Sequence, residues 1–271
     1  TMIVNTNMNA LTAHNAMTKN TALAGNSMEK ISSGLRITKA GDDAAGLAIS
    51  EKMRSQIRGL DQASRNVQDG VSLIQTAEGA MEEVGNILQR MRELTVQGAN
   101  GTNTEEEIAN IEKELSELGT EIERISDTTA FNGKKLLEGT NATVDVQAGA
   151  NKGEKLTINL TNVKDVCSGL KALKVTDLAT ANTSTESIDT ALKSVNTGRA
   201  TLGAQQNRLE YAKNNLTTSS ENLTAAESRI RDVDVAKEMV NLSKMNILQQ
   251  ASQAMISQAN QQPQGVLQLL R

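Results

Sequence analysis

Aromatic residues, proline, histidine and cysteine are almost absent from this 271-residue sequence. It contains no tryptophan and only one phenylalanine, one tyrosine, one proline, one histidine and one cysteine. Aromatic side chains usually supply much of the buried area of a compact core, so any core here must be built from aliphatic side chains and methionine. Because proline ends or kinks helices, its absence before Pro263 leaves long helices uninterrupted.

The same scarcity argues against enzymatic chemistry. With His14 as the one histidine and Cys167 as the one cysteine, neither an HExxH nor a CxxC metal site can occur. An internal disulfide is impossible for the same reason, and a triad that used His14 would lie in a segment that we expect to be poorly ordered. We therefore predict no catalytic residues, no metal site and no cofactor.

Charge and hydropathy exclude two further classes of partner. The net charge of −4 arises from interspersed acidic and basic residues, without the basic face or stacking aromatic residues typical of nucleic-acid binding. No apolar run approaches the ~20 residues of a membrane span. The N-terminal stretch also lacks the basic and apolar regions of a conventional secretory signal. We expect neither nucleic-acid binding nor membrane insertion.

Apolar residues recur with heptad spacing in three long segments. The first, about 44 to 98, follows an N-cap at Asp42 or Asp43 and predicts a helix about 80 Å long at ~1.5 Å per residue, which requires a rod. Capping-box patterns at Thr104–Glu107 and Thr183–Glu186 predict the starts of the other two. The repeats are Met53, Leu60, Val67, Ile74, Met81 and Leu88; Ile108, Ile111, Leu115, Leu118, Ile122 and Ile125; and Ile188, Val195, Leu202, Leu209, Leu216, Leu223 and Ile230.

Between the second and third segments the apolar period changes to two. Val144 and Val146 alternate with polar residues, and Leu156 and Ile158 do so after an Ala-Asn-Lys-Gly turn. This pattern predicts a β-hairpin, with a short strand near 135–138. Residues 161–185 are rich in threonine, serine and asparagine and are expected to form a loop with one helical turn.

The two chain ends have weaker apolar faces, rich in alanine and methionine. Burial of alanine contributes far less than the roughly 1.5–3 kcal/mol of a buried leucine or methionine, whereas ordering a residue costs about 1–2 kcal/mol. We therefore predict that the ends are marginally stable alone and fold on assembly. The proposed assembly seam comprises Ala10, Met17, Ala24, Ile31, Ile247, Leu248, Ala251, Ala254 and Met255.

Three of the five residues at the alternate N-terminal seam position are polar. That position is occupied by Asn7, His14, Thr21, Met28 and Leu35. His14 is interpreted as a polar seam residue that sets the register, or alternatively as a pH-sensitive switch. At the other end of the chain, the helical pattern continues beyond a possible hinge at 232–234 to about Gln262, where Pro263 and Gly265 are expected to end it.

Several blocks of the sequence are distinctive: MIVNTNMNAL (2–11), KISSGLRITKAGDDAAGLAIS (30–50), SRNVQDGVSLIQTAEGAMEEVGNILQRMRELTVQGANGTN (64–103), TAFNGKKLLEG (129–139), VQAGANKGEKLTINL (146–160) and the C-terminal block from Ser228 to Arg271. Together these blocks resemble bacterial flagellin. The resemblance covers about 1–160 and 186–271. The shortness of the region between implies a form without the outer variable domains of longer members.

The resemblance implies a mainly α fold, an elongated rod of long antiparallel coiled-coil helices with a small β-hairpin region and paired terminal helices. An N-terminal assembly helix (1–40) would pair with a C-terminal one (236–271). A central rod (41–127 and 186–235) would carry the hairpin and a short variable region (128–185). The implied function is polymerisation into the extracellular flagellar filament, which serves motility. Alternatives are a hook–filament junction protein and a non-polymerising coiled-coil adaptor.

The resemblance also implies partners other than the chain itself. These are an export chaperone, the type III export apparatus, and hook-associated and cap proteins. QRMREL (89–94) resembles the patch that the vertebrate Toll-like flagellin receptor reads, which implies contacts through Gln89, Arg90, Leu94 and Glu114. The C-terminal residues Val266, Leu267, Leu269 and Leu270 resemble a segment bound by the chaperone and by cytosolic inflammasome receptors. Packing in a filament would constrain the same residues without any receptor.

Overall fold

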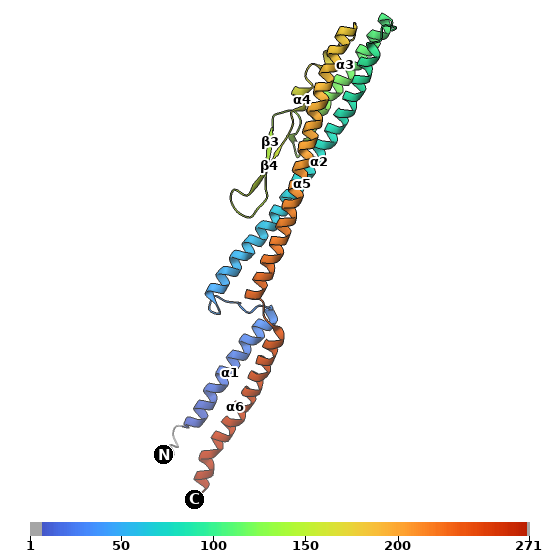
Figure 1. Ribbon diagram of the computed structural model, residues 1–271. Helices are drawn as coiled ribbons and strands as arrows, with labels where there is room; N and C mark the ends of the chain where they lie inside the picture. Colours follow the sequence, from blue (N-terminus) through green and yellow to red (C-terminus); the bar gives the residue numbers. More distant parts are fainter. Residues whose placement is uncertain (1–6, 270–271) are drawn as a thin grey trace. The chain divides into compact units, whose positions relative to one another are not determined.

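The computed structural model describes the backbone of residues 7–269 and the side chains of residues 7–262 (Figure 1). The fold is mainly helical, as predicted. The helices are α1 (Met8–Ser33), α2 (Ala44–Gly98), α3 (Glu105–Thr128), α4 (Val163–Val166), the 3₁₀ helix η1 (Leu170–Ala172), α5 (Leu178–Arg231) and α6 (Val235–Leu269). The strands are β1 (Ala130–Phe131), β2 (Lys134–Lys135), β3 (Thr143–Gln147) and β4 (Lys155–Asn159).

The chain divides into two compact units. The terminal unit contains residues 1–55 and 222–271, and the central unit contains residues 56–221. Both divisions fall inside the long helices α2 and α5 rather than at their ends.

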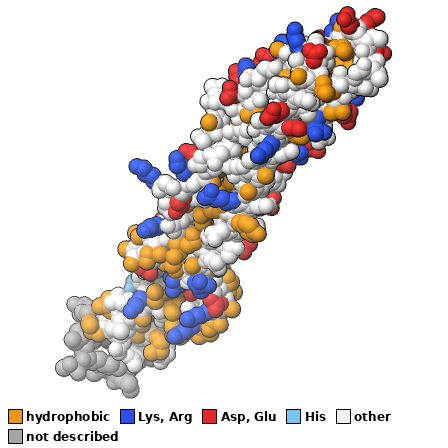
Figure 2. All heavy atoms as spheres, turned by 45° about the horizontal axis from the view of Figure 1, so that its top comes forward, with side chains coloured by type: hydrophobic (Ala, Val, Ile, Leu, Met, Phe, Trp, Pro, Cys, Tyr) orange, Lys and Arg blue, Asp and Glu red, His pale blue; other side chains and the backbone are white. Residues whose placement is uncertain are grey.

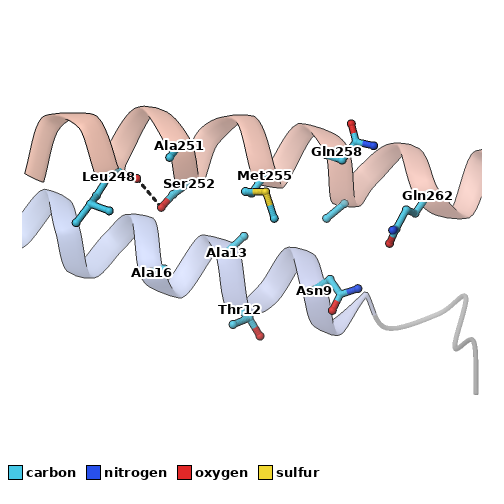
Figure 3. A pocket seen from close by; sticks show the side chains of 11 residues that line it. Asn9, Thr12, Ala13, Ala16, Leu248, Ala251, Ser252, Met255, Gln258 and Gln262 are labelled. Carbon is cyan, nitrogen blue, oxygen red and sulfur yellow. Dashed lines mark hydrogen bonds between the residues drawn. The ribbon is translucent and has the colours of Figure 1, made fainter. Parts of the chain in front are cut away.

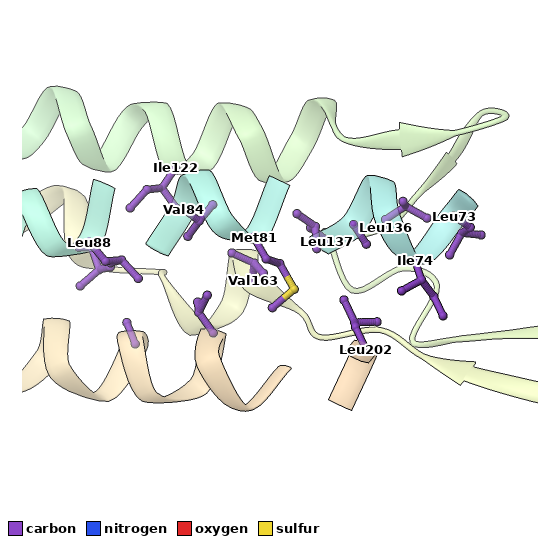
Figure 4. Close-up of a cluster of buried hydrophobic side chains, with 14 of the residues drawn as sticks. Leu73, Ile74, Met81, Val84, Leu88, Ile122, Leu136, Leu137, Val163 and Leu202 are labelled. Carbon is purple, nitrogen blue, oxygen red and sulfur yellow. The ribbon is translucent and has the colours of Figure 1, made fainter. Parts of the chain in front are cut away.

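The central unit has an aliphatic core formed by the predicted heptad stripes. Ile74, Met81 and Leu88 of α2 are completely buried, as are Leu115 of α3 and Leu202 of α5. Figure 4 shows the α2 side chains between α3 and α5, together with Leu136, Leu137 and Val163 from the connecting segment. The capping box at the start of α3 is also confirmed, with Thr104 and Glu107 bonding each other's backbone N–H groups.

The predicted β-hairpin is present and covers part of this core. Strands β3 and β4 are antiparallel, with Val144 opposite Ile158 and Val146 opposite Leu156. Ile158 is 1% exposed, so one face of the hairpin is buried while the other carries the ion pair between Asp145 and Lys155 at 2.5 Å. Hydrogen bonds from Lys155 and Thr157 lower the pKa of Asp145.

Close approach of the elements depends on glycine at two positions. A Cβ atom on Gly198 of α5 would lie 2.4 Å from the Thr161 hydroxyl oxygen and 2.6 Å from the Met81 methyl carbon. A Cβ on Gly119 of α3 would lie 2.8 Å from the Lys171 Cα atom in η1. Because both distances are shorter than van der Waals contact, these helices could not pack as they do around a larger residue.

Two predictions for the connecting region need correction. Helix α5 begins at Leu178, so Thr183 and Glu186 lie inside it and form no capping box; the Thr183 hydroxyl instead donates to the Ala179 carbonyl oxygen. The Thr180 hydroxyl accepts from the Asp177 N–H at 2.9 Å at the actual start of the helix. The strand predicted near 135–138 is limited to β2, because Leu136 and Leu137 turn into the core.

In the terminal unit, α1 and α6 pack against each other in antiparallel orientation. Next to the start of α6 the pair is joined by an isolated antiparallel bridge between Leu35 and Asp232. The hinge predicted at 232–234 corresponds to the break between α5 and α6. Of the two N-cap candidates for α2, Asp43 has the role, since its Oδ1 atom accepts from the Gly46 N–H at 2.8 Å.

The prediction that Pro263 and Gly265 end the last helix is wrong. Helix α6 continues through both to Leu269. A proline inside a helix removes the hydrogen bond to the carbonyl four residues earlier, which here belongs to Ala259. That carbonyl accepts a hydrogen bond from the Asn7 side chain instead.

Candidate functional site

The α1–α6 pair buries a narrow seam of mostly small side chains. The seam follows heptad spacing on both helices, and only Ala24, Ser27 and Ala259 in it fall below a tenth exposure. Its members are Ala10, Ala13, Met17, Asn20, Ala24, Ser27 and Ile31 on α1, and Leu242, Met245, Gln249, Ser252, Ile256 and Ala259 on α6. The N-terminal half of the predicted assembly seam therefore contacts α6 of the same chain.

The second seam position on α1 differs from the prediction. His14, Thr21 and Met28 are exposed, and positions 13, 20 and 27 take their place. Positions 14, 21 and 28 and positions 13, 20 and 27 both fit heptad spacing. Ala13 and Ser27 have smaller side chains than His14 and Met28, so they let α6 approach more closely. His14 is thus absent from the seam that α1 forms with α6 of the same chain.

The C-terminal half of the predicted seam lies outside the α1–α6 contact. Ile247 is 65% exposed and Met255 62% exposed, and Leu248, Ala251 and Ala254 are also exposed. Sequence reasoning assigned a single apolar face to α6, whereas the helix has two. The inward face packs on α1 and consists of Leu242, Met245, Gln249, Ser252, Ile256 and Ala259. The outward face is left uncovered in a single chain and consists of Ile247, Leu248, Ala251, Ala254 and Met255.

A groove runs along the junction between α1 and the outward face of α6. It has a volume of about 550 Å³. Figure 3 shows its walls, in which alanines leave space between the helices and Met255 and Leu248 supply the larger apolar surface. The groove is lined by Asn9, Thr12, Ala13 and Ala16 from α1, and by Leu248, Ala251, Ser252, Met255, Gln258, Ala259 and Gln262 from α6.

Uncovered apolar surface is concentrated in the terminal unit. Among the described residues, all of the exposed large hydrophobic side chains belong to it except Val96, Leu178 and Tyr211. Figure 2 shows hydrophobic side chains gathered over the terminal unit, while acidic and basic side chains predominate over the central unit. Large apolar patches on a soluble chain mark interaction surfaces, so the terminal unit is the candidate assembly surface.

A second candidate surface lies on α2 and α3 in the central unit. The Arg90 guanidinium donates to Glu114 Oε1 through Nη2 at 3.0 Å and through Nε at 3.2 Å, and to Glu93 Oε2 through Nη1 at 3.2 Å. The hydrogen bonds to Glu114 and Glu93 raise the pKa of Arg90. Gln89 is exposed beside it. The structure therefore brings three of the four predicted receptor contacts, Gln89, Arg90 and Glu114, to one exposed surface.

The fourth, Leu94, lies elsewhere. Its side chain is 2% exposed and belongs to the core of the central unit. It supports the helix that carries Arg90 but offers no side-chain surface to a receptor.

Comparison with known proteins identifies the family. The model of the bacterial flagellin N-terminal helical region matches residues 4–142, and that of the bacterial flagellin C-terminal helical region matches residues 185–270. The chain belongs to the bacterial flagellin family. It is similar over the full length of both chains to the flagellins of Halalkalibacterium halodurans, at 60% identity, and Bacillus subtilis, at 50% identity. It also resembles the crystal structure of Bacillus cereus flagellin, at 37% identity and a TM-score of 0.52, over 60% of this chain and 94% of that one.

As a flagellin, the protein is a structural subunit and not an enzyme. Copies polymerise into the flagellar filament outside the cell, which serves motility. Full-length similarity to filament subunits favours this function over the hook–filament junction and adaptor alternatives.

The described residues of the flagellin contain neither an activated cysteine nor a cluster of metal ligands. Cys167 is partly buried, and burial raises its pKa to about 11, so the reactive thiolate is scarce at neutral pH. No group of three or more potential metal ligands occurs within the described part of the chain. Among the described helices none is sufficiently long and apolar for a membrane span. The predicted chaperone and receptor segment, Val266, Leu267, Leu269 and Leu270, lies outside the described side chains.

Proposed function

We propose that the flagellin subunit assembles by placing the groove and the outward face of α6 against terminal helices of neighbouring copies. In this division of roles, residues 1–40 and 236–271 are the assembly helices, 41–127 and 186–235 form the structural support, and 128–185 carry the hairpin. The observation that supports it is the exposure of Ile247 and Met255 on a helix whose opposite face is already paired. A surface of this kind on a polymer-forming chain is the surface that polymerisation can cover.

The test is a polar substitution on the outward face. Ile247→Asn should raise the critical concentration for filament growth at least about tenfold, because burying an isoleucine contributes roughly 1.5–3 kcal/mol. Stability of the free subunit should change by less than about 0.5 kcal/mol, since the side chain is already exposed. Sedimentation of polymer against soluble subunit measures the first quantity, and thermal unfolding the second.

Leu178→Asn provides the matched control. Leu178 is 64% exposed, close to the 65% of Ile247, but it belongs to the central unit. The critical concentration of the Leu178→Asn variant for filament growth should stay within about twofold of the parent value. Equal effects of the two substitutions would refute the assignment of assembly to the outward face.

Recognition by the vertebrate Toll-like flagellin receptor is a second proposed function, supported by the Arg90 cluster. Two acidic side chains hold the guanidinium in one orientation, which lowers the entropic cost of using it as an anchor. Gln89, Arg90 and Glu114 would form the contact surface. The proposed partners also include the export chaperone, the type III export apparatus, and the hook-associated and cap proteins. A cytosolic inflammasome receptor that binds Val266, Leu267, Leu269 and Leu270 is a further proposed partner.

Arg90→Ala should weaken binding to the receptor ectodomain at least about tenfold, as expected for a central arginine anchor. The matched control is Arg92→Ala. Arg92 also lies on α2 and pairs with Asp189 at 2.7 Å, and the two arginine side chains are 51% and 50% exposed. Surface plasmon resonance with immobilised ectodomain measures both. The proposal fails if the two substitutions weaken binding equally, or if Arg90→Ala leaves it unchanged.

A further inference from the structure

Asn7 makes two hydrogen bonds that join the start of α1 to the far end of α6. Its Oδ1 atom accepts from the Ala10 N–H at 3.1 Å and caps helix α1. Its Nδ2 atom donates to the carbonyl oxygen of Ala259 at 2.7 Å. Ala259 is 7% exposed, so this second bond satisfies an acceptor that has limited access to water.

The Ala259 carbonyl needs this partner because of the sequence that follows it. In an α-helix each carbonyl accepts from the N–H four residues later, and residue 263 is a proline, which has no N–H. Pro263 is the single proline of the chain. Proline therefore leaves a helical carbonyl without its usual donor at one position of the sequence. The Asn7 side chain donates to that carbonyl.

The α1–α6 seam mixes alanine and serine with five larger apolar side chains and the polar residues Asn20 and Gln249. Contacts among these side chains also bear on the register. At the opposite end of the pair the register is fixed by backbone hydrogen bonds, from Val233 N–H to Gly34 O at 3.0 Å and from Arg36 N–H to Arg231 O at 2.6 Å. The bond between Asn7 and Ala259 is the corresponding constraint at the chain ends.

We propose that Asn7 is a positioning residue that fixes the register of α1 against α6 by bonding the carbonyl that Pro263 leaves free. A shifted register would move Asn9, Thr12, Ala13 and Ala16 relative to the outward face of α6 and so change the walls of the groove. The bond thereby determines the surface that neighbouring copies meet. The inference concerns the terminal unit and rests on the proposed role of that groove in polymerisation.

The test separates the two bonds of Asn7 and then restores the missing donor. Asn7→Ser keeps a good N-cap residue but removes the amide that reaches Ala259. We expect its critical concentration for filament growth to rise about tenfold. In a Pro263→Ala background the helix regains an N–H for the Ala259 carbonyl, so the same Asn7→Ser change should raise the critical concentration by less than about threefold. Asn15→Ser, at an exposed position on α1 outside both the groove and the seam, is the matched control and should change little.

Hydrogen exchange in assembled filaments distinguishes this role from simple capping. Asn7→Ser should accelerate amide exchange in α6 around residues 255–262 as well as in the first turn of α1, and Pro263→Ala should suppress the acceleration in α6. The proposal would be overturned if Asn7→Ser raised the critical concentration equally in the parent and Pro263→Ala backgrounds. It would also be overturned if the faster exchange were confined to α1, or if Asn7→Ser had no effect. If Asn7→Ser fails to polymerise, failure of Pro263→Ala to rescue it would also overturn it. Loss of the groove proposal would instead appear as an Ile247→Asn variant that polymerises normally.

Discussion

We expect deletion of residues 1–38 or of residues 236–271 to abolish filament growth and to leave the central unit folded. Either deletion removes one helix of the α1–α6 pair, and with it one wall of the groove. The central unit retains its own core, in which all members come from residues 63–216. We expect no polymer by electron microscopy or sedimentation at concentrations about 100-fold above the critical concentration of the parent.

Thermal unfolding followed by circular dichroism supplies the control for this prediction. Each truncated chain should melt in one cooperative transition, because the buried stripes of α2, α3 and α5 are intact. Long fibres from either truncated chain would contradict the prediction. A truncated chain without a cooperative transition would show that the terminal helices also support the core.

The terminal helices of a single copy should be only marginally ordered. Within their described side chains, α1 and α6 fully bury only small residues, Ala24, Ser27 and Ala259, whose burial offsets little of the roughly 1–2 kcal/mol of backbone entropy lost per ordered residue. Covering Ile247 and Met255 on assembly adds the larger apolar contributions. Circular dichroism of subunit and filament should therefore show a gain of helix on polymerisation.

Local signals in the sequence predict most of the central unit. The predicted helix from about 44 to 98 matches α2, because an N-cap aspartate, an unbroken heptad stripe and a glycine-rich turn mark its course. The Thr104–Glu107 capping box and the hairpin alternation were equally reliable, since each depends on residues close in sequence. The same reasoning failed at Thr183–Glu186, where an equivalent pattern lies inside α5. There Ala181 is 1% exposed and the Ser184 hydroxyl bonds the Lys174 carbonyl, so packing extends the helix beyond the apparent cap.

In the terminal unit, patterns in short stretches of sequence do not predict how the helices pack. Whether His14 or Ala13 lies on the seam depends on how closely α6 approaches, and whether Ile247 faces α1 depends on which stripe of α6 is used. The Ala259 carbonyl, which Pro263 leaves without a helical donor, accepts instead from Asn7, 252 residues away in sequence. None of these outcomes is encoded in a short window. The family resemblance implies that the chain ends are the assembly segments, but only the geometry of the paired helices separates the two faces of α6.

The second large effect is expected in the core of the central unit, from Leu88→Ala. Leu88 is completely buried in the seam of α2, and deletion of a leucine side chain from such a site costs about 2–5 kcal/mol through lost burial and the cavity that remains. For a domain of about 150–250 residues, each kcal/mol corresponds to about 2–4 °C in Tm. We expect the Tm of the free subunit to fall by roughly 4–20 °C.

The comparison variant is Met28→Ala in the terminal unit. Met28 is 59% exposed, so its loss should change the Tm of the free subunit by less than about 2 °C. Below the lowered Tm, Leu88→Ala filaments should still grow with nearly the parent critical concentration, because the groove and the outward face of α6 are untouched. A large rise in that concentration at a temperature where the variant is folded would show that the core of the central unit controls assembly directly. A Tm change below about 2 °C would show that the α2 seam contributes far less to stability than its burial indicates.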